Sequence, residues 1–165
     1  MQYGHFYFLV DDYFVQFPDG YLMQNKGTPF HDRPCFYAFE DNNNRGIYWM
    51  IPFSSQIKKY KGIYYSKLHK KGFCDTIVFG KVLGKLKAFL IQNMCPATDD
   101  YIGNEYYSYS EKSMVRIEDF LEEEIINKAT KVLALVRNGE PDLVFPDILK
   151  IEKELLSELG GEWEQ

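Results

Sequence analysis

Two serines and two lysines in one short segment are the residues best suited to chemistry in this sequence. Ser54 and Ser55 directly follow an apolar run at residues 47–53, and Lys58 and Lys59 come two residues later. A hydroxyl group can orient a phosphate oxygen, and a lysine ammonium is a compact charge that can stabilise a developing phosphorane. The segment therefore predicts a phosphate site. The alternative interpretation is a polar strand end followed by an exposed turn.

His31 is the histidine best suited to proton transfer. It lies in a loop-like stretch, residues 18–34, which contains three prolines and two glycines, and Arg33 is close to it in sequence. An imidazole that titrates near neutral pH can act as a general acid or base. A simple hydrogen bond within the loop is the alternative role.

A basic segment follows the serine pair. Residues 56–87 contain nine lysines and one aspartate, a net charge of +8, whereas residues 117–165 have a net charge of −8. The chain's overall charge of −5 therefore hides a local field that can attract phosphates.

Tyrosines alternate with the lysines of this segment, in KKYKGIYYSKLHKK. Aromatic rings stack on unpaired bases while lysines hold the nucleic-acid backbone, although the same tyrosines can equally be strand or packing residues. We expect RNA to be contacted by Arg33, Tyr60, Lys61, Tyr64, Tyr65, Lys67, His69, Lys70, Lys71, Lys81, Lys85 and Lys87.

The motifs of several other site classes are absent from the sequence. It has no HExxH, no His/Cys pair at ligand spacing and no clustered DxD, so no metal site is expected. The glycine motifs of nucleotide sites and the GxSxG nucleophile motif are also missing, so no cofactor is expected. An enzyme built on this sequence would therefore work without a metal ion.

The composition suits one globular domain over residues 1–165, with 45% hydrophobic and 26% charged residues. No apolar run approaches the ~20 residues of a membrane span, and the N-terminus lacks the features of a signal peptide. Three scattered cysteines favour a reducing, cytoplasmic setting.

Strand-like patterns occupy the first two thirds of the sequence. Aromatic and β-branched runs predict strands at residues 3–10, 34–40 and 46–53, and the turn-forming DNNNRG between the last two predicts a hairpin. Alternating residues at 73–79 and 85–91 predict a second antiparallel pair.

Helical spacing of apolar residues begins near Val115 and continues to Val136, with Gly139 as its expected stop. A second helix is expected from about Asp147 to the glycines at 160–161. Strands followed by helices predict an α+β fold, an antiparallel sheet with helices packed against it.

Several of these features, in order, resemble the endoribonuclease toxins of type III toxin–antitoxin systems, the ToxN/CptN/TenpN group, and CptN most of all. They are an aromatic N-terminal strand followed by DYF at 12–14, RPCFYAF at 33–39, PFSS at 52–55, SKLHKKG at 66–72 and NMCPAT at 93–98. The resemblance implies a strongly twisted antiparallel sheet with a Kid/MazF-like core, surrounded by helices.

The resemblance also implies metal-independent cleavage of cellular RNA by 2′-hydroxyl attack, which leaves 2′,3′-cyclic phosphate ends, and a role in phage defence. The antitoxin would be a repeated pseudoknot RNA, processed by the toxin and bound in a closed protein–RNA assembly. By position, the family's hydroxyl pair falls on Ser54 and Ser55, its following lysine on Lys58 or Lys59, and its N-terminal tyrosine on Tyr13. We expect either Tyr13 or His31 to transfer the proton.

Two features depart from this pattern. The spacing between the serine pair and the lysine is one residue longer than in the family, and one strand position differs. The lysine that the family can have in its second strand falls near Cys35, which has no charge, so Arg33 or His31 would have to replace it. Two alternatives to the type III toxin remain: a MazF/Kid-type ribonuclease with a protein antitoxin, and a non-catalytic RNA-binding module.

Overall fold

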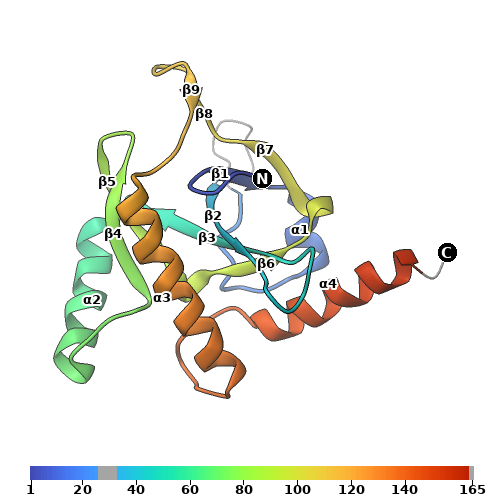
Figure 1. Ribbon diagram of the computed structural model, residues 1–165. Helices are drawn as coiled ribbons and strands as arrows, with labels where there is room; N and C mark the ends of the chain where they lie inside the picture. Colours follow the sequence, from blue (N-terminus) through green and yellow to red (C-terminus); the bar gives the residue numbers. More distant parts are fainter. Residues whose placement is uncertain (26–32, 164–165) are drawn as a thin grey trace.

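An antiparallel sheet lies at the centre of the molecule (Figure 1). In the computed structural model, which describes residues 1–25 and 33–163, the sheet has seven strands in the order β4-β5-β3-β2-β1-β7, with β6 pairing beside β3. These strands are β1 (Phe6–Leu9), β2 (Pro34–Glu40), β3 (Tyr48–Ser54), β4 (Ile77–Val82), β5 (Lys85–Leu90), β6 (Cys95–Ala97) and β7 (Ile102–Glu105). A small separate hairpin joins β8 (Tyr107–Ser108) to β9 (Ser113–Met114).

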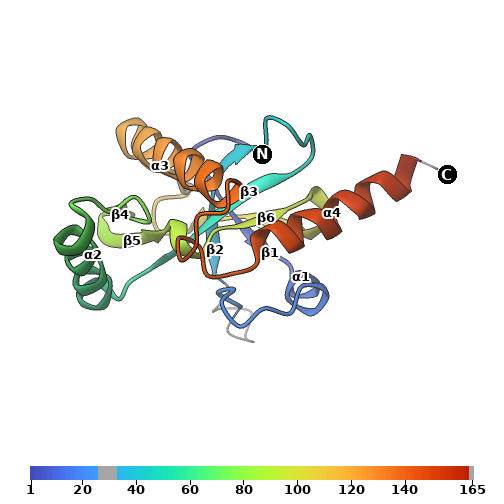
Figure 2. The same ribbon diagram turned by 90° about the horizontal axis from the view of Figure 1, so that it is seen from below.

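Helices surround this sheet, so the expected α+β fold is confirmed. Within the described residues they are α1 (Asp11–Gln16), α2 (Ile57–Lys71), α3 (Asp119–Arg137) and α4 (Ile148–Trp163), with short 3-10 turns η1 (Ile91–Asn93) and η2 (Asp99–Tyr101). Figure 2 shows α4 extending away from the sheet at the opposite end of the molecule from α2.

The predicted hairpin between residues 34–40 and 46–53 is confirmed. Strands β2 and β3 pair antiparallel, with Phe36 opposite Ile51 and Cys35 opposite Pro52. The second predicted pair is also present, but β4 begins at Ile77 and not at residue 73. The strands β4 and β5 are joined through Leu83 and Gly84, both with positive φ, as a tight two-residue hairpin turn requires.

The helices confirm the predicted helical spacing with one difference. Helix α3 ends at Arg137, and the expected stop Gly139 has φ of 88°. Helix α4 continues to Trp163, so the prediction that the glycines at 160–161 end it is wrong. No helix in the described part of the chain is long and apolar enough to cross a membrane.

The first half of the basic segment, Ile57–Lys71, forms helix α2, and not the exposed turn or strand that its composition allowed. Its inward residues Ile57, Tyr60, Ile63 and Tyr64 recur at helical spacing and pack over β4 and β5. The lysines of the helix other than Lys67 are exposed on its opposite side. Gly72 has φ of 79° and ends the helix in the left-handed conformation.

The two faces of the sheet are covered by different helices. Helix α2 packs on the face that presents Ile77, Ala88 and Leu90, and we call this the α2 face. Helix α3 covers the other face, the α3 face, where a methyl group on Gly80 would collide with the side chain of Leu121. Figure 1 shows the two helices on either side of the β4–β5 hairpin.

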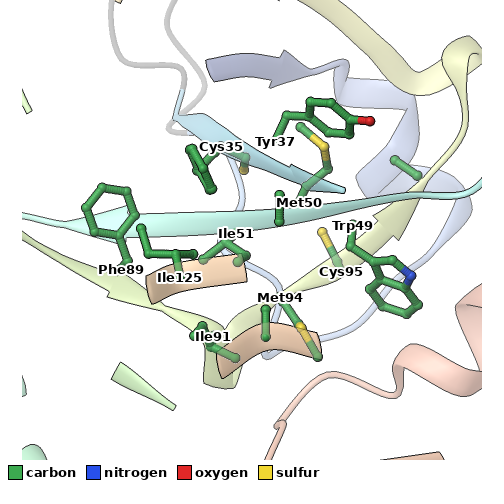
Figure 3. Packing of buried hydrophobic residues seen from close by; sticks show 14 of the residues in the cluster. Cys35, Tyr37, Trp49, Met50, Ile51, Phe89, Ile91, Met94, Cys95 and Ile125 are labelled. Atoms are coloured by element: carbon green, nitrogen blue, oxygen red, sulfur yellow. The ribbon is translucent and has the colours of Figure 1, made fainter. Parts of the chain in front are cut away.

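The larger hydrophobic core lies on the α3 face and between the central strands and α4. Figure 3 shows Ile51, Phe89, Ile91 and Ile125 of this core close together, and Trp49 nearby is fully buried. This packing fixes the end of β3, where the predicted phosphate site begins.

Candidate active site

The two serines at the end of β3 point to opposite faces of the sheet, because successive strand residues alternate. Ser54 lies opposite Ala88, on the α2 face, and is buried. Its Oγ accepts a hydrogen bond of 3.1 Å from the backbone N–H of Gln56, which helps to begin α2. Ser55 is exposed. Ser54 therefore shapes the site, whereas Ser55 is open to a ligand.

Lys87 on β5 lies beside Ser55. Continuing the register Phe53–Phe89 by two residues puts Ser55 and Lys87 opposite each other on the α3 face. The Nζ of Lys87 donates a hydrogen bond of 2.6 Å to the Ser55 Oγ. The sequence indicates Lys87 only as one of the expected RNA contacts. Its partner Ser55 is 32 residues away and is found from the strand register alone.

The beginning of α2 completes a basic hollow around Ser55. The hollow has a volume of about 750 Å³ and is lined by Ser55, Gln56, Ile57, Lys58 and Lys59. Helix α2 has no acidic residue in its first turn, and both lysines are exposed there. Lysines at the positive end of a helix dipole are unfavourable unless an anion is present. This arrangement of ammonium groups and first-turn backbone N–H groups is of the kind that attracts anions, and we call it the anion site.

Arg33 lies on the other side of the serine pair. Extending the β2–β3 register from Cys35 opposite Pro52 by two residues puts Arg33 beside Ser54. Its Nε atom is buried and has no hydrogen-bond partner in the described chain. Cys35 itself is buried, and burial raises the pKa of its thiol well above the usual range, so it remains uncharged. Of these two residues, Arg33 is thus the charged one, and it lies beside Ser54.

The structure does not bring Tyr13 to this site. Its ring is fully buried, and its hydroxyl donates a hydrogen bond of 2.7 Å to the carbonyl of Pro96. Pro96 pairs with Trp49, five residues before Ser54 and therefore about 16 Å along the strand. Burial also raises the pKa of the phenol well above its usual value. A structural role explains Tyr13, and the expectation of proton transfer by this residue is wrong. His31 lies outside the described residues.

The basic segment divides into exposed and inward side chains. The exposed members lie on α2 and the β4–β5 hairpin, and together we call them the exposed basic surface: Lys58, Lys59, Lys61, Tyr65, His69, Lys70, Lys71, Lys81 and Lys85. Tyr60 is buried and Tyr64 packs on Phe79, so the expectation that these two rings stack on RNA is wrong.

Lys67 is also directed inward. Its Nζ donates hydrogen bonds of 2.7 Å to the Thr76 hydroxyl and 3.2 Å to the Gln92 side-chain oxygen. Burial lowers the pKa of its ammonium group. The expectation that Lys67 contacts RNA is therefore contradicted by its hydrogen bonds, and the residue links α2 to the sheet.

Lys61→Met is expected to weaken RNA binding, whereas Lys67→Met is not. A lysine on a phosphate contributes about one unit to the slope of log affinity against log salt, and only Lys61 is free to do so. Fluorescence anisotropy of a single-stranded RNA across a salt series measures both slopes. Equal slopes for the two variants would contradict this division of the basic segment.

Across residues 1–25 and 33–163, no three His, Cys, Asp or Glu side chains are close enough together to hold a metal ion. The three cysteines are free and buried. The hollow thus presents hydroxyl, ammonium and backbone N–H groups, which suit a phosphate ester.

The comparison with solved structures finds proteins of similar fold. The chain is similar to AbiQ, a lactococcal anti-phage endoribonuclease of a type III toxin–antitoxin system. The match has a TM-score of 0.65 and covers 98% of each chain, with 12% of the residues identical. No protein-family model matches the sequence, and no curated protein matches it. The two chains therefore share a fold over essentially their whole length.

Proposed function

We propose that this protein is the endoribonuclease toxin of a type III toxin–antitoxin system, as one domain over residues 1–165. The observation that carries the proposal is the anion site at the start of α2, where Ser55, Lys58 and Lys87 come together at the end of a strand. The shared fold with an endoribonuclease of this class supports the same reading.

Cleavage would use the 2′-hydroxyl of the RNA as nucleophile. The 2′-oxygen attacks the adjacent phosphorus, its proton passes to a base, and the bond from phosphorus to the 5′-oxygen breaks. The leaving 5′-oxygen takes up a proton, so the products are a 2′,3′-cyclic phosphate and a 5′-hydroxyl. DNA lacks the nucleophile, which explains selectivity for RNA. His31 is the proposed proton-transfer residue on sequence grounds.

Each described side chain has a distinct part in this proposal. Lys58, with Lys59 beside it, neutralises the phosphorane, whose extra negative charge develops only in the transition state. Ser55 orients a phosphate oxygen and is itself held by Lys87. Ser54 fixes the start of α2, and Arg33 provides a further positive charge on its side of the serine pair.

The antitoxin in this proposal is an RNA of pseudoknot repeats, which the toxin processes and then retains. It would occupy the exposed basic surface and close the anion site by binding over it. Two RNA-binding regions on each protein molecule allow protein and RNA to alternate in a closed assembly. The acidic helices α3 and α4 leave helix α2 free, since α3 covers the sheet face opposite α2 and α4 lies at the far end of the molecule (Figures 1 and 2). Cytoplasmic action and phage defence belong to the same proposal.

The products of cleavage test the proposed reaction. Purified protein is expected to cut single-stranded RNA in the presence of EDTA and to leave 2′,3′-cyclic phosphate ends, which mass spectrometry detects. A substrate with a single 2′-deoxynucleotide at the cut site is the matched control and should stay intact. A strict requirement for magnesium, or 3′-hydroxyl products, would show that the mechanism is wrong.

Two alternatives give different results. A non-catalytic RNA-binding module would bind RNA and release no cyclic phosphate products. A MazF/Kid-type ribonuclease would cleave but be neutralised by a small protein encoded beside it, whereas the type III toxin is neutralised by tandem non-coding repeats.

A further inference from the structure

A second concave surface lies at the β7 edge of the sheet and has no part in the chemistry above. This groove has a volume of about 840 Å³ and runs between β7, β8 and the tip of the β4–β5 hairpin. Its lining includes Phe8, Asn25, Leu83, Asn104, Tyr107 and Tyr109. Aromatic rings and amide groups thus meet in one groove.

The charge of the groove differs from that of the basic surface on α2. Its lining includes no lysine or arginine, and its two carboxylates already have partners. The side-chain amide of Asn25 donates to Asp11, and the ring of His5 pairs with Glu105. A surface of this kind does not hold phosphates, whose affinity comes from lysine and arginine. It suits the uncharged part of a nucleotide, the base.

Tyr109 projects from this groove on the β8–β9 hairpin, which extends beyond the sheet (Figure 1). Its side chain is 87% exposed. The ring of Tyr107 lies almost perpendicular to it, with centroids 5.0 Å apart. A perpendicular contact covers at most one face of the Tyr109 ring, and its high exposure leaves the other face open, as a stacking platform for an unpaired base requires.

The groove and the anion site are connected along the sheet. Phe8 pairs with Pro34, and Pro34 lies opposite Phe53 when the register of β2 and β3 is continued by one residue. Phe8 is thus two strand spacings, about 10 Å, from Phe53. Ser55 follows Phe53 on the same face. A single RNA strand with its phosphate at Ser55 can therefore extend into the groove within a few nucleotides.

We propose that this groove binds an unpaired base of the RNA next to the scissile phosphate and thereby selects where the RNA is cut. Tyr109 stacks on the base, and the exposed amide of Asn104 donates to and accepts from its edge. Only the choice of the cleavage position depends on the proposed ribonuclease function, since base binding by the groove can be measured without cleavage.

The test compares Tyr109→Ala and Tyr109→Phe with the wild-type protein in two measurements. Fluorescence anisotropy of short single-stranded RNAs gives the affinity, and sequencing of products from a random RNA pool gives the cut sites. Because base–aromatic stacking is worth ~1–3 kcal/mol, Tyr109→Ala should weaken RNA binding by about 5- to 150-fold. Tyr109→Phe keeps the ring and should bind RNA nearly as the wild type does.

Asn104→Ala is expected to relax the base preference at one position beside the cut while cleavage continues. The matched control for Tyr109→Ala is Tyr21→Ala. Tyr21 is also exposed, but its ring packs on Phe145 and is not part of the groove lining. This control should change neither the affinity nor the cut sites. Circular dichroism of each variant shows whether the fold is retained.

The two proposals fail in different ways. If wild-type protein cleaves RNA and Tyr109→Ala keeps both its affinity and its cut sites, the groove proposal is overturned and the proposed function stands. If wild-type protein binds RNA with an affinity that depends on Tyr109 but releases no products, the proposed function is overturned and base binding by the groove stands. Protein that neither binds nor cleaves RNA would overturn both.

Discussion

Lys58→Ala is expected to slow RNA cleavage by about 10²–10³-fold, with little change in RNA affinity, because one preorganised group that stabilises transition-state charge typically contributes this much. Lys58 is exposed in the first turn of α2 and lines the hollow beside Ser55. Its ammonium group meets the phosphate where negative charge increases during the reaction, so the rate constant of a single turnover should fall more than the affinity does.

Lys70→Ala is the matched control for this prediction. Lys70 is an exposed lysine on the same helix, but it lies in the last turn. Its loss removes the same charge from the basic surface and should weaken RNA binding slightly without slowing the bound complex. Single-turnover kinetics at saturating protein separate the two effects. Equal rates for Lys58→Ala and Lys70→Ala would contradict the placement of the phosphate at the start of α2.

Lys59→Ala decides which of the two neighbouring lysines is closer to the reacting phosphate. The Nζ of Lys59 lies 5.2 Å from the centre of the Tyr60 ring. This cation–π contact already engages the ammonium group of Lys59. We therefore expect Lys59→Ala to have the smaller effect on the rate.

The central strands could be predicted from the sequence because their signals are local. A run of aromatic and β-branched residues on each side of a turn-forming DNNNRG segment determines both the strands and their hairpin. Helix α2 could not be predicted in this way. Its tyrosines have strand propensity, which opposes the helix propensity of its lysines, and packing over Ile77, Ala88 and Leu90 selects the helical period.

The candidate site, too, could be predicted only where its residues are neighbours in sequence. Ser55 and Lys58 are neighbours in sequence, and their types alone indicated a phosphate site. The contact between Ser55 and Lys87 depends on the register of β3 and β5, which no local pattern specifies. Tyr13 shows the opposite case, since its position in sequence suggested chemistry but the fold buries it against Pro96. Of the groove residues, Asn104, Tyr107 and Tyr109 lie in the segment 102–114, whose short strands gave no periodic signal.

A buried charge network connects helices α3 and α4 to the sheet. Arg137, the last residue of α3, donates to Asp41 after β2 and to Glu152 on α4, at 2.7 and 2.5 Å. Trp49 also donates to Asp41, at 2.9 Å, and Asn44 donates to Glu152, at 3.0 Å. One guanidinium thus serves two carboxylates whose side chains are 1% and 8% exposed.

Arg137→Met is expected to destabilise the protein by ~3–5 kcal/mol at pH 7, because removal of one partner leaves buried charges uncompensated. Methionine keeps much of the side-chain volume, so the loss reflects charge more than a cavity. Urea unfolding followed by circular dichroism measures the effect. The matched control is Arg116→Met, which breaks an exposed pair with Asp119 and should cost less than ~1 kcal/mol. A similar loss in both variants would show that the network contributes no more than a surface pair.

The pH dependence of Arg137→Met separates charge from packing. Burial raises the pKa of Asp41, but hydrogen bonds from Trp49 and Arg137 outweigh it, so the pKa lies below its ordinary value of 3.8 in the folded protein. A lowered carboxyl pKa stabilises the fold above 3.8, and this contribution is lost as the pH falls through the folded value. Without Arg137 the pKa of Asp41 should rise, and protonation then relieves the buried charge. The difference in unfolding free energy between wild type and Arg137→Met should therefore be largest near pH 7 and decrease steadily below pH 4. A difference that stays constant over this range would mean that packing, and not charge, explains the effect.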